Sequence, residues 1–224
     1  MPHPPALFPI FLRMQGRNCV VIGAGRIAQG KVQSLCRAGA QVTVVAPQAT
    51  ARLQKMAREK KLRWIPRRFR AGDVVGATLV VAATNSPAVH EAVFQACRRA
   101  RVLCNVVDDP ERCDFFYPAV VRRDPLQIAI STAGASPMLA SRLRRELEQQ
   151  FGPQYARWLR QITATRRGII ESALPPKEKR ARLHTLSSAD ALAEFVRKER
   201  KALGKARVQR AHPNVAGRGG LPCS

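Results

Sequence analysis

Acidic residues are scarce in this 224-residue chain, in which 15 Asp and Glu side chains stand against 39 Lys and Arg, for a formal net charge of +24. The basic excess is present both in residues 1–150 and in residues 151–224, so it does not belong to one tail. Such a charge favours polyanionic partners: nucleic acid, anionic lipid or a small substrate with many carboxylates. A solvated, arginine-rich surface with no such partner is the alternative that composition leaves open.

Several patterns that would define other classes of protein are missing. The six cysteines form no C-x-x-C pair and no dense cluster, which excludes a disulfide scaffold and an ordinary structural zinc site. The four histidines include no pair at metal-ligand spacing. With two Trp and two Tyr, the chain has few stacking platforms for single strands, so we expect no nucleic-acid partner.

The sequence contains no candidate for a signal peptide or a membrane span. Its start has no basic region, and the apolar stretch from Ala6 to Leu12 is short and interrupted by proline. We therefore expect a cytoplasmic protein without a membrane partner.

A glycine-rich turn is the most specific motif. The β-branched run Val20–Ile22 leads into Gly-x-Gly-x-x-Ala, formed by Gly23, Gly25 and Ala28, and a helix-compatible segment follows. Here Gly23 allows a tight turn, Gly25 lets a pyrophosphate approach the backbone, and Ala28 lets the helix pack closely on the strand. The phosphates would bind the free N–H groups at the helix start. The motif predicts a dinucleotide-binding site.

The first half of the chain alternates strands and helices, which predicts an α/β fold, a Rossmann-like doubly wound parallel sheet, over residues 1–112. The expected strands are Asn18–Gly23, Gln41–Ala46, Leu62–Ile65, Thr78–Ala83 and Val102–Val107, and the expected helices are Arg26–Arg37, Ala49–Lys61 and Pro87 to about Arg99.

The pattern changes after Asp108. Phe115–Arg122 and Leu126–Ser131 predict an antiparallel pair, and Ser136 followed by Pro137 predicts a helix start, so residues 113–150 form a separate small α+β segment. Residues 151–203 predict a C-terminal helical domain whose helices, Gln154–Leu174 and Ala189–Leu203, are separated by a charged link at Pro175–Arg182. Residues 204–224 lose apolar periodicity, which predicts a disordered tail.

The second strand lacks the acidic residue that often binds the ribose hydroxyls in nicotinamide-binding units. The segment Val42–Gln48 contains no carboxylate, so the sequence is a weak guide to whether the cofactor is NAD or NADP. Arg52 could meet a 2′-phosphate, although an exposed helical arginine is the stronger interpretation.

The order and spacing of many short segments resemble the precorrin-2 dehydrogenase and sirohydrochlorin ferrochelatase family, the leading module of siroheme synthases. The resemblance covers about residues 7–150 and continues loosely through Arg166–Gly168. The segments that carry it are Pro9–Leu12, Gly16-Arg17, Gly23–Ala28, Val42–Pro47, Ala82–Thr84, Cys104–Asp108, Cys113–Phe116, Leu126–Thr132 and Ala135–Pro137.

This resemblance implies NAD-dependent oxidation of precorrin-2 to sirohydrochlorin, a reaction of sirohaem biosynthesis, with iron(II) insertion as a further activity that the sequence leaves open. It also implies a homodimer, with residues 113–150 as the dimerisation segment. The substrate would be a polycarboxylate tetrapyrrole, which suits the arginine-rich charge. Too few residues follow position 150 for the methyltransferase domain of some relatives, which predicts a stand-alone module.

The resemblance also assigns site residues. Asp108 would be the catalytic carboxylate, accepting a proton or transiently holding the metal, whereas a turn residue is the alternative interpretation of Asp-Asp-Pro. Asn105, Thr132 and Ser136 would bind substrate or order the site. The cofactor contacts would be Gly23, Gly25, Arg26, Ile27, Pro47, Gln48, Ala83 and Thr84.

Other functions compatible with a Rossmann unit on a basic chain are an NAD-sensing or nucleic-acid-binding regulator and a tetrapyrrole scaffold without catalysis. The first predicts salt-dependent nucleic-acid binding that does not need Asp108. The second predicts tetrapyrrole binding without NADH production.

Overall fold

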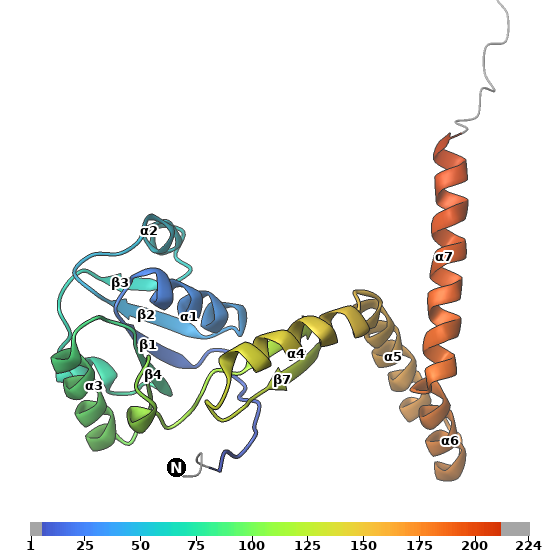
Figure 1. Ribbon diagram of the computed structural model, residues 1–224. Helices are drawn as coiled ribbons and strands as arrows, with labels where there is room; N and C mark the ends of the chain where they lie inside the picture. The colour runs from blue at the N-terminus through green and yellow to red at the C-terminus, as the bar shows by residue number, and fades with distance from the viewer. Residues whose placement is uncertain (1–5, 212–224) are drawn as a thin grey trace, which may run out of the picture. The chain divides into compact units, whose positions relative to one another are not determined.

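The computed structural model describes residues 6–211, which fold into two compact units (Figure 1). The first unit comprises the described residues through Pro118 together with Ser131–Pro137, and the second comprises Ala119–Ile130 and the chain from Met138 onward. The first unit thus extends past the expected boundary at residue 112. Residues of the expected segment 113–150 are shared between the two units.

A five-stranded, entirely parallel sheet forms the centre of the first unit, in the order β3-β2-β1-β4-β5. The predicted Rossmann-like α/β fold is therefore confirmed. The strands are β1 (Asn18–Ile22), β2 (Gln41–Val45), β3 (Arg63–Ile65), β4 (Leu79–Ala82) and β5 (Leu103–Val106).

Helices cover both faces of this sheet, which explains why its strands are nearly continuous runs of valine and other apolar residues. On one face, Val21 and Val44 pack with α1 (Arg26–Arg37) and α2 (Ala51–Arg58). On the other face, Val20 and Val80 pack with α3 (Pro87–Ala100). The 3-10 helices η1 (Ala71–Val74) and η2 (Pro110–Arg112) complete the unit.

The second unit combines a hairpin with helices. Strands β6 (Ala119–Arg123) and β7 (Leu126–Ile130) pair antiparallel, as the alternation of apolar residues predicted. The helices are α4 (Pro137–Gln150), α5 (Gln154–Glu171), α6 (Pro176–Leu186) and α7 (Ala189–Ala211). No helix in the described part of the chain is long and apolar enough to span a membrane.

Two expectations for the C-terminal region were wrong. The charged link predicted at Pro175–Arg182 is mostly helix α6, which has Pro176 at its first position and an ion pair of 2.7 Å between Glu178 and Arg182, one turn apart. Helix α7 continues through Gly204 to Ala211, because good helix formers such as Ala, Lys, Arg and Gln outweigh the missing apolar periodicity. The rest of the predicted tail, residues 212–224, lies outside the described residues.

Candidate functional site

In the turn after β1, the position of Gly23 has room only for a residue without a side chain. The backbone there has φ +101°, and a Cβ atom would overlap the carbonyl oxygen of Ala83 at the end of β4. Hydrogen bonds of 2.9 Å from Gly23 N to Val45 O and 2.8 Å from Ala83 N to Ile22 O hold the three chain segments together. The glycine therefore lets the first turn lie directly against its neighbour in the sheet.

Gly25 has a different role, because its φ of −75° is open to any residue and a Cβ atom there would meet nothing within 4 Å. It is the N-cap of α1, whose first turn has no capping side chain and no acidic residue. The N–H groups of that turn are therefore without a side-chain acceptor at the N-cap, and the space before them is free. Behind them, Ala28 is fully buried against the sheet, as the motif predicted. This arrangement fits the pyrophosphate of a dinucleotide.

The turn after β4 forms the next part of the site. The Thr84 hydroxyl accepts a hydrogen bond of 3.2 Å from Ser86 N, and the Ser86 side chain caps α3 through Val89 N at 3.4 Å. His90 Nε2 lies 2.9 Å from the carbonyl oxygen of Thr84. The first turn of α3 is thus fixed to the turn that precedes it.

Asp108 follows β5 at the same edge of the sheet. Val107 N donates to Ala82 O at 2.9 Å, which continues the parallel pairing up to the residue before Asp108. Asp108 itself is exposed and has φ +62°, a left-handed conformation that is uncommon for a residue with a side chain. Asp is one of the residue types that adopt this conformation readily, and the position just after β5 places this carboxylate where open α/β sheets bind ligands.

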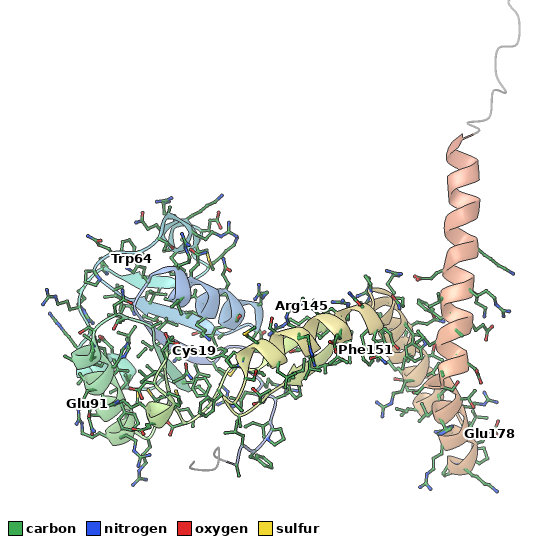
Figure 2. The ribbon with its side chains drawn as sticks, viewed as in Figure 1. Cys19, Trp64, Glu91, Arg145, Phe151 and Glu178 are labelled. Atoms are coloured by element: carbon green, nitrogen blue, oxygen red, sulfur yellow. The ribbon has the colours of Figure 1, made fainter. Side chains whose placement is uncertain are left out.

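An arginine attaches the turn after Asp108 to α3. Arg112 donates to Glu91 Oε2 at 2.8 Å and to Asp109 Oδ2 at 2.5 Å, and Figure 2 labels Glu91 on α3. Hydrogen bonds from Gln95 and from Arg112 hold the pKa of Glu91 below its usual value. The network restrains both sides of the turn that carries Asp108.

Asn105 is the only buried polar side chain among the described residues, at 6% exposure. Its amide donates to Phe115 O at 2.8 Å and to Cys113 Sγ at 3.3 Å, and its backbone forms an isolated bridge with Cys113. Asn105 therefore fastens the chain after the site to β5, a geometry that suits the ordering role rather than direct contact with a ligand.

These turns line a cleft of about 570 Å³ at the carboxyl edge of the sheet. Of the predicted site residues it brings together Gly25, Arg26, Ile27, Ala83, Thr84 and Asp108. It is also lined by residues that no sequence spacing marks as functional, namely Asn85, Pro87, His90, Val107, Asp109 and Arg112. A larger hollow, of about 1080 Å³, lies where β1, β2 and β3 begin and contains none of the predicted residues.

The other predicted residues lie outside the lining of this cleft. Pro47 and Gln48 are exposed just after β2, at the same edge of the sheet. Thr132 and Ser136 belong to the first unit, where the Thr132 hydroxyl accepts a hydrogen bond of 3.2 Å from Ser136 N. Gly23 shapes the turn from beneath.

Comparisons with known proteins agree with this geometry. Residues 10–119 match a family model of NAD(P)-binding domains, and residues 123–150 match the central domain of sirohaem biosynthesis proteins. The chain is 34% identical over 226 residues to the siroheme synthase of Actinobacillus pleuropneumoniae serotype 3, covering 93% of this chain and 46% of that protein. It is 42% identical over 141 residues to the siroheme synthase of Neisseria meningitidis serogroup C, covering 63% and 29%.

A solved structure also matches. SirC, a precorrin-2 dehydrogenase, superimposes with a TM-score of 0.72 at 25% identity, covering 87% of this chain and 100% of that one. The curated siroheme synthases, by contrast, are longer proteins, of which this chain spans half or less.

Proposed function

Because this chain belongs to the siroheme synthase family, we propose that it oxidises precorrin-2 to sirohydrochlorin with NAD as the hydride acceptor. One observation carries the proposal: a dinucleotide-type glycine turn and the exposed carboxylate residue Asp108 line the same cleft. The match to SirC along that protein's whole length supports the same reaction.

The cofactor would lie along the carboxyl edge of the sheet. The first turn of α1, with Gly25, Arg26 and Ile27, would hold the pyrophosphate through N–H groups that no side chain caps. Ala83 and Thr84 would contact the nicotinamide half, and Pro47 and Gln48 would contact the adenosine half through backbone groups. When bound, the nicotinamide accepts the hydride removed from the substrate.

Asp108 is the residue that we assign to proton removal. Oxidation of the macrocycle removes one hydride and one proton, and an exposed carboxylate that lines the cleft can accept that proton from a ring carbon or a pyrrole nitrogen. Asn105 orders the chain behind it, and Thr132 and Ser136 are proposed to bind substrate or order the site.

Iron(II) insertion is a second step that we propose for the same site. Iron would enter as a substrate, with Asp108 as its transient protein ligand. Among residues 6–211, no group of three or more His, Cys, Asp or Glu side chains is placed to hold a metal ion. We further propose a homodimer in the cytoplasm.

Anaerobic spectrophotometry tests the proposal. Purified protein is mixed with enzymatically made precorrin-2 and NAD or NADP, and the appearance of reduced cofactor and of sirohydrochlorin is followed. Oxidation that requires both protein and cofactor is the expected result. Iron(II) is then added, and sirohaem formation above a protein-free control would support the chelatase. Folded protein that oxidises precorrin-2 with neither cofactor would refute the dehydrogenase.

A further inference from the structure

Lys31 is a half-buried cation near this site that the proposed reaction does not yet use. It lies on α1 one turn beyond Ile27, which lines the cleft. Its Nζ atom lies 3.7 Å from the centroid of the Tyr117 ring, a cation–π geometry. The ring thus fixes the position of the ammonium.

The ring itself is held by the chain that follows β5. Tyr117 packs against Phe115 with ring centroids 5.7 Å apart, and the Phe115 carbonyl accepts the amide of buried Asn105 at 2.8 Å. Burial raises the pKa of the Tyr117 hydroxyl well above its usual value. The group facing Lys31 is therefore an uncharged aromatic ring, which does not neutralise the ammonium.

The electrostatic surroundings of Lys31 point to an external anion. Burial lowers the pKa of its ammonium, whereas the negative charge of Asp108 opposes that shift. Within residues 6–211, Lys31 nevertheless makes no hydrogen bond or direct ion pair with a carboxylate. A partly desolvated ammonium of this kind is stabilised most strongly by an anion that contacts it directly.

We propose that Lys31 binds one carboxylate of the tetrapyrrole substrate and so positions the macrocycle beside Asp108. The inference rests on the proposed function for the identity of the substrate. It gives the two residues separate tasks, because Lys31 anchors and selects a polycarboxylate whereas Asp108 receives the proton. Lys31 is thus a specificity-determining residue.

Kinetics of Lys31→Gln and Lys31→Arg test the assignment. For Lys31→Gln we expect the KM for precorrin-2 to rise about ten- to a hundredfold, the contribution of a charge-assisted hydrogen bond. The KM for NAD should stay at the wild-type value, and kcat should change much less than KM. Lys31→Arg should recover part of the substrate affinity because it keeps the charge. The matched control is Lys55→Gln, which removes an exposed lysine of α2.

A purely structural role for Lys31 predicts something else. In that case Lys31→Gln and Lys31→Arg would lower the melting temperature and affect both substrates equally. Wild-type KM values for precorrin-2 in a folded Lys31→Gln variant would overturn the proposal.

A binding measurement separates failure of this inference from failure of the proposed reaction. Fluorescence titration compares uroporphyrin with coproporphyrin, a tetrapyrrole with fewer carboxylates, on wild-type protein and Lys31→Gln. We expect the wild type to prefer uroporphyrin and the variant to lose much of that preference. If the wild type fails to oxidise precorrin-2, the proposed reaction is refuted, and the titration still decides the role of Lys31. An unchanged preference in the variant would refute that role.

Discussion

Replacing Gly25 by Asp should separate cofactor binding from folding. A Cβ atom at this position meets nothing within 4 Å, and its φ of −75° suits any residue, so the native backbone accommodates the change. Asp is also a better N-cap than the average residue and lies favourably at the positive end of α1. Relative to glycine, the stability should therefore be unchanged or rise by a few tenths of a kcal/mol.

The same substitution should abolish tight cofactor binding. The new side chain occupies the space through which a pyrophosphate would reach the helix N–H groups, and its negative charge repels the phosphates. Losing one charge-assisted hydrogen bond and adding this repulsion should cost about 3 kcal/mol or more, which is at least a hundredfold in Kd.

Isothermal titration calorimetry with NAD, beside a thermal melt, measures both effects. Gly30→Asp is the matched control, since it puts the same charge on the same helix at an exposed position with nothing within 4 Å of the new Cβ. It should leave the Kd for NAD unchanged. Wild-type affinity in a folded Gly25→Asp variant would refute the assignment of the turn to the pyrophosphate.

Three further outcomes are expected. Asp108→Asn keeps a residue type that tolerates the left-handed backbone, so melting should be unchanged while anaerobic precorrin-2 oxidation falls by about 10²- to 10⁴-fold; full activity would remove this carboxylate from the mechanism. Gly23→Ala should destabilise the protein by about 3 kcal/mol in urea unfolding, from the positive φ and the overlap with Ala83, and a loss below about 1 kcal/mol would contradict the geometry. Hydrogen bonds from Arg67 lower the pKa of Asp73 in the folded protein. The pair therefore stabilises the fold at pH values above the unfolded-state pKa of Asp73, and this stabilisation is lost as the pH falls through the folded-state pKa. Asp73→Asn should lower the free energy of unfolding by about 1 kcal/mol at pH 7 and by clearly less at pH 3.

Local sequence was sufficient to predict the sheet and the glycine turn that we assign to the cofactor. The run Leu79–Ala82 is apolar on both faces, as expected of a strand buried in a parallel sheet. At Gly23, a Cβ atom would overlap the Ala83 carbonyl oxygen, which explains the glycine in the motif. Helix α6 was missed because its sequence lacks an apolar stripe, the pattern from which helices are predicted. The ion pair between Glu178 and Arg182 stabilises this helix without creating such a stripe.

The remaining site residues depend on three-dimensional packing. Arg112 reaches Glu91 only because the turn after β5 lies beside α3, and no sequence spacing encodes that approach. The same is true of Lys31 and Tyr117, which are far apart in the chain but in contact in the fold. Asp108 was assigned through the resemblance, since Asp-Asp-Pro alone favours a simple turn.

The contact between Gly23 and the Ala83 carbonyl also limits how this protein can change. Any side chain at Gly23 would have to displace the Ala83 carbonyl, so the inner boundary of the proposed cofactor site tolerates little change at this residue. The rim after β2 tolerates substitution more readily, because Pro47, Gln48 and Arg52 are exposed. Replacing these residues should change the free energy of unfolding only slightly. Any drift or redesign towards a different dinucleotide would therefore proceed through this rim, with the inner turn inherited unchanged.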